Sequence, residues 1–200
     1  MTTLNQKSSK MNGSLTSDPD SFSDEAWSLL LIAEQSARRW RHKDLDVEHL
    51  IEVLFRNKKY QKYTNSLPVN HEALNEILEN FIAELPINNQ TDLFIGEDLE
   101  ILLETADDFR SRWGSNQIEI SHILIAIGRD SRLGEDLFYQ AGLPSEILEA
   151  ELRRLPAPKS FKQSKRIKDK PIINRTQKDS QSFMPTETTS KDPKPELLNP

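Results

Sequence analysis

The sequence predicts an all-α protein in which a duplicated four-helix repeat with pseudo-twofold symmetry forms one compact eight-helix domain. Three observations lead to this prediction. Apolar residues recur at spacings of three and four through the middle of the chain, as they do on one face of a helix. No alternating run of β-branched residues is bounded by hairpin turns. The pattern of the first half of this region returns in the second half.

Composition divides the 200-residue chain into three regions. Residues 1–21 are polar, and we expect them to be disordered. Residues 22–155 carry the helical apolar pattern. Residues 156–200 are rich in Lys, Ser, Thr and Pro, and we expect a basic disordered tail. This tail holds ten Lys/Arg against five Asp/Glu although the whole chain has a net charge of −6, so the helical region must be strongly acidic.

The first repeat, about residues 22–85, is expected to form four helices. Ser23 is a suitable N-cap for the first helix because acidic residues follow it in the first turn. One face of this helix is apolar and consists of Ala26, Leu30, Ala33, Ala37 and Trp40.

Three shorter helices are expected after the first one. The second starts after Asp46 and buries Leu50, Val53 and Leu54. The third lies near residues 58–65. The fourth follows Pro68, which interrupts the helical pattern. Its expected buried face consists of Leu74, Ile77, Leu78 and Phe81.

The second repeat, about residues 94–155, follows a polar linker around residues 88–92. A shift of 73 residues aligns Arg39 with Arg112, and it also aligns residue types that are rare in this chain. These further matches are Trp40 with Trp113 and His49 with His122. Neither half can bury much apolar surface alone, so we expect the two halves to share one core.

Ordered motifs in both halves resemble a known domain. The first copy contains Phe22-Ser23-Asp24-Glu25-Ala26, Trp40-Arg41-His42 and residues 47–54, and the second contains residues 94–98, Trp113-Gly114 and residues 120–124. This pattern resembles the Clp N-terminal (Clp repeat) domain of the ClpA, ClpB and ClpC unfoldases over about residues 22–153. Those unfoldases also carry AAA+ modules with a GxxxxGK[ST] phosphate loop, and none of the six glycines here forms that motif. We therefore expect a stand-alone domain that does not hydrolyse ATP.

The resemblance implies a docking role. In the family this domain receives adaptors and substrates, so we expect a non-catalytic, protein-binding accessory factor of the Clp protease and chaperone system. The expected partners are Clp protease core or Clp ATPase subunits, adaptors or substrate proteins, rather than nucleic acid or a membrane. The expected location is the cytoplasm, or the plastid stroma if the source is a photosynthetic eukaryote.

A second implication of the resemblance concerns degradation tags. ClpC-type domains bind phosphorylated arginine, and the residues that matter there match Ser23 and Glu48 in the first repeat. The equivalent positions of the second repeat are Gly96 and Ser121, which lack the carboxylate. An alternative function is therefore a phosphoarginine receptor or decoy with its site in the first repeat.

Other conspicuous residues are expected to be structural. Trp40 and Trp113 should end the first helix of each repeat, and His49 and His122 should hydrogen-bond locally. Gly114 should end its helix in the left-handed conformation. Arg41 stands at the equivalent position of the first repeat, where we expect a different turn. With no Cys and no clustered third ligand, the sequence predicts neither a metal nor a cofactor.

Two charged segments leave alternatives open. Carboxylates between residues 97 and 108 could be paired for catalysis, but an exposed helix face is normally charged, and we expect no enzyme activity. The basic tail could bind nucleic acid or an acidic protein surface, remain a solvated linker, or fold on docking to a protease subunit. Its candidate interacting residues are Lys159, Lys162, Lys165, Arg166, Lys168 and Lys170.

Overall fold

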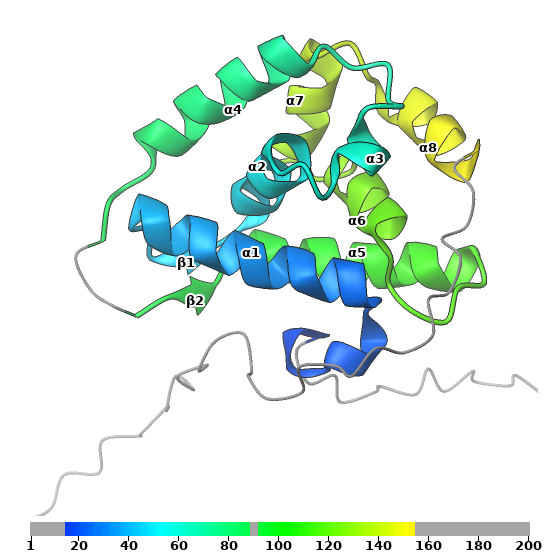
Figure 1. Ribbon diagram of the computed structural model, residues 1–200, viewed down its shortest axis with the longest axis horizontal. Helices are drawn as coiled ribbons and strands as arrows, with labels where there is room; N and C mark the ends of the chain where they lie inside the picture. The colour runs from blue at the N-terminus through cyan, green and yellow to red at the C-terminus, as the bar shows by residue number, and fades with distance from the viewer. Residues whose placement is uncertain (1–14, 89–91, 155–200) are drawn as a thin grey trace, which may run out of the picture.

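The computed structural model describes residues 15–88 and 92–154, which form eight α-helices (Figure 1). The first repeat comprises α1 (Asp24–Trp40), α2 (Val47–Arg56), α3 (Gln61–Thr64) and α4 (His71–Glu84). The second comprises α5 (Glu97–Arg112), α6 (Ile120–Ile127), α7 (Gly134–Gln140) and α8 (Ser145–Arg154). The predicted all-α, duplicated architecture is confirmed.

Helices α2 and α6 lie in the middle of the molecule, with α1 and α5 on one side and α4, α7 and α8 on the other (Figure 1). Because both central helices are enclosed, nearly all of their residues are buried. A single cluster of buried apolar side chains extends through both repeats. Within the described ranges, none of the helices has the length and apolar character needed to span a membrane.

Two short parallel pairings join the repeats. Strand β1 (Asp44–Leu45) pairs with β2 (Phe94–Ile95), so that Leu45 lies opposite Ile95. The second pairing is a parallel bridge between Phe22 and Ile118. The 73-residue shift converts Leu45 into Ile118 and Phe22 into Ile95, so each pairing is the symmetry mate of the other. The offset found in the sequence is therefore also the pseudo-twofold relation of the fold.

The two central helices begin with the same capping arrangement. Nδ1 of His49 accepts a hydrogen bond at 3.0 Å from the backbone N–H of Asp46, the N-cap of α2. Nδ1 of His122 accepts one at 2.9 Å from the backbone N–H of Glu119, the N-cap of α6. Both histidines thus occupy the place that Glu or Gln takes in an ordinary capping box.

One predicted boundary and one predicted buried face need correction. Residues 15–21 were expected to be disordered, but they form the 3₁₀ turns η1 (Leu15–Ser17) and η2 (Pro19–Ser21), since the carbonyl of Ser21 accepts a hydrogen bond from Ile118 N–H at 2.8 Å. The buried face of α4 consists of Leu74, Leu78 and Ile82. Ile77 and Phe81, which the prediction placed on that face, are only partly buried.

The expected difference between the two helix-ending turns is not present. Gly114 has a φ of 70°, and Arg41 adopts the same left-handed conformation with a φ of 59°. A side chain makes this conformation costly by roughly 1–2 kcal/mol. The backbone N–H groups of Arg41 and His42 both bond to α1 carbonyls, so the turn persists despite the substitution.

Candidate functional site

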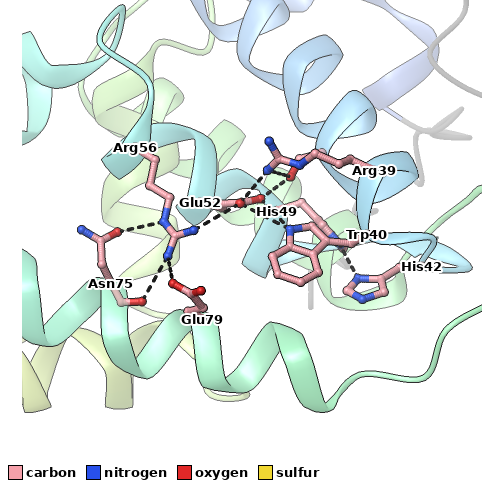
Figure 2. Close-up of polar contacts among 9 residues, drawn as sticks. Arg39, Trp40, His42, His49, Glu52, Arg56, Asn75 and Glu79 are labelled. Atoms are coloured by element: carbon pink, nitrogen blue, oxygen red, sulfur yellow. Dashed lines mark hydrogen bonds and ion pairs between the residues drawn. The ribbon is translucent and has the colours of Figure 1, made fainter.

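A carboxylate is buried between α1 and α2 (Figure 2). Glu52 lies on the enclosed helix α2, and its side chain is only 3% exposed. The Ser36 hydroxyl and the Trp40 indole N–H of α1 both donate hydrogen bonds to it, the latter at 3.2 Å. An unpartnered carboxylate in this position would be very costly, so these donors allow Glu52 to remain inside.

Two guanidinium groups flank Glu52. Nη2 of Arg39 donates a hydrogen bond to Oε1 at 2.8 Å, and Nη1 of Arg56 lies 3.7 Å from the same oxygen. Arg56 is also tied to α4, through hydrogen bonds to Asn75 and an ion pair of 2.6 Å with Glu79 (Figure 2). The Arg39 side chain is 69% exposed. Glu52 therefore orients two guanidinium groups at the surface.

A cavity of about 450 Å³ lies beside this cluster. That volume is within the range of pockets that hold small molecules, about 300–1,000 Å³. Its lining combines aliphatic, amide and charged side chains: Ile32, Gln35, Ser36, Arg39, Glu52, Val53, Arg56 and Asn57. We call this cavity the α1–α2 pocket.

The second repeat shows what the fold requires at these positions. The 73-residue shift places Phe109 at the position of Ser36 and Ile125 at the position of Glu52. Both of these residues are buried. The equivalent helices α5 and α6 therefore pack through an apolar contact at these positions. The fold does not require the buried carboxylate of the first repeat.

The arginines of the second repeat are also arranged differently. Arg112, which corresponds to Arg39, lies over the Phe109 ring at 5.2 Å. Arg129, which corresponds to Arg56, pairs with Glu149 of α8 at 3.3 Å. The indole N–H of Trp113 is buried without a hydrogen-bond partner in the described part of the chain. The buried carboxylate with its flanking guanidinium groups therefore has no counterpart at the equivalent described positions of the second repeat.

Two histidines and a glutamate meet at the start of α2. Nδ1 of His49 accepts from Asp46, so the neutral ring carries its proton on Nε2 and donates it to Nδ1 of His42 at 2.8 Å. Burial lowers the pKa of both histidines, which favours the neutral pair. Potential ligand atoms of His42, Glu48 and His49 lie within 4.8 Å of one another, a spacing that could hold a metal. The sequence showed no clustered third ligand beside His49, and the structure corrects this, with hydrogen bonds that engage both nitrogens of the His49 ring.

The Glu48 carboxylate is already paired with a guanidinium group of the same chain. Arg132, between α6 and α7, is 2.5 Å from Glu48, 2.7 Å from Asp98 and 3.7 Å from Asp46. Burial and the charge of Glu48 raise the pKa of Asp46 to about 7. A Cβ atom on Gly96 would lie 2.3 Å from the Asp46 carboxylate, so only glycine fits there. Arg132 thus links the starts of α2 and α5.

The structure places the two predicted ligand residues beside different partners. Ser23 caps α1 by accepting from Ala26 N–H at 3.2 Å, and its own N–H donates to Ile118 at the start of α6. Glu48 lies at the start of α2 and pairs with Arg132, which also pairs with Asp98 at the start of α5. The predicted tail residues between 159 and 170 lie outside the described residues.

Sequence reasoning missed Glu52, Arg39, Arg56 and Arg132. The signal for Glu52 was present in the internal alignment, because the shift of 73 residues places a glutamate opposite Ile125 in the middle of an apolar helix. Arg132 gives no such signal, since only the fold brings it to Glu48.

Comparison with known proteins agrees with the fold. A family model described as the Clp repeat (R) N-terminal domain matches residues 21–140. Chaperone protein ClpB 2 of Parasynechococcus marenigrum (strain WH8102) is 49% identical over 142 residues, which cover 71% of this chain and 16% of that protein. Chaperone protein ClpB 2 of Synechocystis sp. (strain ATCC 27184 / PCC 6803 / Kazusa) is 28% identical over 141 residues, which cover 69% and 16%.

Solved structures show the same fold at low sequence identity. The Hsp104 N-terminal domain from Candida albicans has a TM-score of 0.59 at 16% identity, covering 67% of this chain and 90% of that one. The N-terminal domain of ClpD from Arabidopsis thaliana has a TM-score of 0.52 at 15% identity, covering 66% and 95%. The chain spans about 16% of the length of the curated relatives named above. Because the family model matches more than half of its residues, this chain belongs to the Clp repeat N-terminal domain family.

Proposed function

We propose that this chain is a non-catalytic protein-binding module of the Clp system, which docks to Clp subunits, adaptors or substrate proteins. The observation that carries the proposal is the family match over residues 21–140, together with 49% identity to a ClpB chaperone. The phosphate-loop motif of the ATPase modules does not occur in the 200 residues, so nothing in them supports ATP hydrolysis.

The asymmetry between the repeats supports a binding role for the first repeat. A buried charged cluster is rarely the most stable solution, because apolar residues of similar volume are often as good or better. The second repeat contains that apolar solution, with Phe109 and Ile125. The presence of Ser36 and Glu52 at these positions of the first repeat supports a role in binding.

A pull-down from native extract of the source organism tests the proposal. The full chain would be immobilised, and proteins recovered at low salt would be identified by mass spectrometry. We expect Clp protease, Clp ATPase or adaptor proteins. A second bait that ends before Pro156 separates binding by the helical domain from binding by the basic tail. Recovery of no Clp component by either bait would contradict the proposal.

A second candidate function is recognition of phosphoarginine as a degradation tag. One observation favours it: Glu48 is part of an arrangement that already holds a guanidinium, that of Arg132. A tag must displace Arg132 to reach Glu48, which makes this candidate testable by removing that side chain. Nucleic-acid binding by the tail remains a weaker alternative, and it predicts steeply salt-dependent binding that truncation at Pro156 abolishes.

A further inference from the structure

We infer that the α1–α2 pocket binds the C-terminal residue of a partner polypeptide. Arg39 and Arg56 would hold the terminal carboxylate, and Ile32 and Val53 would contact an aliphatic last side chain. This inference rests on the proposed function, and it specifies the chemistry of the partner that the first repeat recognises.

The first argument is the balance of hydrogen-bonding groups in the pocket. The Glu52 oxygens already accept from Ser36, Trp40 and Arg39. Each guanidinium has five N–H donors. Arg56 uses Nε and Nη2 on Asn75 and Glu79, whereas Arg39 donates through Nη2 alone within the described residues. The donors left over in the described residues are Nε and Nη1 of Arg39, whose side chain is 69% exposed, and Nη1 of Arg56, which lies 3.7 Å from Glu52. Guanidinium forks match the geometry of a carboxylate, which they bind with two parallel hydrogen bonds.

The second argument is the local charge. Residues 35–63, which include the second half of α1 and all of α2, contain eight Lys/Arg and four Asp/Glu. The equivalent residues 108–136 of the second repeat contain four Lys/Arg and five Asp/Glu. Three of these cations pair with carboxylates outside the segment, since Arg38 pairs with Glu34, Arg56 with Glu79 and Lys62 with Glu25. The largely exposed Arg39 is therefore the pocket cation that is best placed to attract an anionic group.

The third argument concerns why the ligand is a chain end. The pocket lies between just two helices, and its aliphatic, amide and guanidinium groups are close together. A terminal residue presents a carboxylate, a peptide group and a side chain in the same compact space. The amide of Gln35 offers a donor and an acceptor to that peptide group, whereas Asn57 offers its donor, because its Oδ1 already accepts from Lys59 N–H. An internal acidic residue would instead require space for the chain on both sides.

Peptide binding by the full chain tests the inference. The probe is a fluorescein-labelled Gly-Ser-Gly-Ser-Leu-Leu peptide with a free C-terminal carboxylate, followed by fluorescence anisotropy. We expect saturable binding of this peptide. The same peptide with a C-terminal amide should bind at least about tenfold more weakly, because a charge-assisted contact is lost. An amidated peptide with an internal Glu between leucines distinguishes a side-chain carboxylate from a chain end, and it should bind as weakly as the other amide.

Matched substitutions locate the site. We expect Arg39→Gln and Arg56→Gln each to weaken binding about tenfold. The equivalent changes in the second repeat, Arg112→Gln and Arg129→Gln, should leave the affinity unchanged, and circular dichroism checks that all four variants are folded. Equal binding of acid and amide, equal losses in both repeats, or no binding at millimolar peptide would each overturn the inference. Recovery of Clp components without peptide binding would leave the proposed function standing.

Discussion

Removal of the buried carboxylate should destabilise the domain measurably. Glu52→Ala leaves the buried hydroxyl of Ser36 and the indole N–H of Trp40 without their acceptor. Each buried donor left unpaired costs roughly 1–3 kcal/mol. Arg39 is largely exposed and can return to water, so its lost ion pair adds little. Two such donors would cost about 2–6 kcal/mol, and because Trp40 is only partly buried we expect the free energy of unfolding to fall by about 2–4 kcal/mol.

A second variant tests the physical reason for this loss. Ser36→Phe combined with Glu52→Ile rebuilds the apolar pair found in the second repeat. Replacing a buried charged cluster with apolar residues of suitable shape is often neutral, or stabilising by about 1–4 kcal/mol. The adjacent cavity of about 450 Å³ gives the added ring room to pack. We expect the double variant to be more stable than Glu52→Ala by about 2 kcal/mol.

Urea and thermal unfolding, followed by far-ultraviolet circular dichroism, measure both variants. For a chain of this size, 1 kcal/mol corresponds to about 2–4 °C in Tm, so Glu52→Ala should lower Tm by roughly 4–16 °C. Glu79→Ala, at the exposed end of the same chain of contacts, is the control and should change stability by less than about 0.5 kcal/mol. Wild-type stability of Glu52→Ala, or a double variant less stable than the single one, would refute this reasoning.

Three further predictions concern other parts of the fold. Because the pKa of Asp46 is raised to about 7, the folded protein binds more protons just below that pH than the unfolded chain does. The free energy of unfolding should therefore fall by about 1 kcal/mol between about pH 6.5 and about pH 8. Urea titrations should show this fall in the wild type, and the contribution of Asp46 to it should be absent from Asp46→Asn. Arg41→Gly should stabilise the domain by up to about 1 kcal/mol in thermal melts and Gly114→Ala should destabilise it by about 1 kcal/mol, since both positions are left-handed; opposite signs would contradict this. Millimolar phosphoarginine should shift amide NMR signals near Glu48 more in Arg132→Ala than in the wild type, and Glu48→Ala should abolish the shift; no shift in any variant would end that proposal.

The helical architecture could be predicted from the sequence because it depends on local and repeated signals. Helix periodicity, the Ser23 cap and the 73-residue offset are all properties of the chain itself. The offset even relates the two inter-repeat pairings, although strands of two residues are too short to be recognised from their own pattern.

Most of the candidate site could not be predicted from the same signals. The 73-residue offset places Glu52 opposite the apolar Ile125, but only the packing of α1 against α2 brings the donors of Ser36 and Trp40 to it. Glu48 could be selected as a ligand residue, but Arg132 follows it by 84 residues, and no local pattern links the two. Arg41 was expected to change its turn, yet the hydrogen bonds at the end of α1 maintain the left-handed conformation.

Site-specific photocrosslinking measures most directly whether partners bind at the first repeat. A photoreactive amino acid would replace Gln35, which lines the α1–α2 pocket, or Asp108, its exposed equivalent in the second repeat. After irradiation in native extract, we expect adducts with Clp subunits, adaptors or substrates from position 35 and markedly fewer from position 108. Equal yields from both positions, or adducts from position 35 that contain no Clp component, would contradict a partner-binding site in the first repeat.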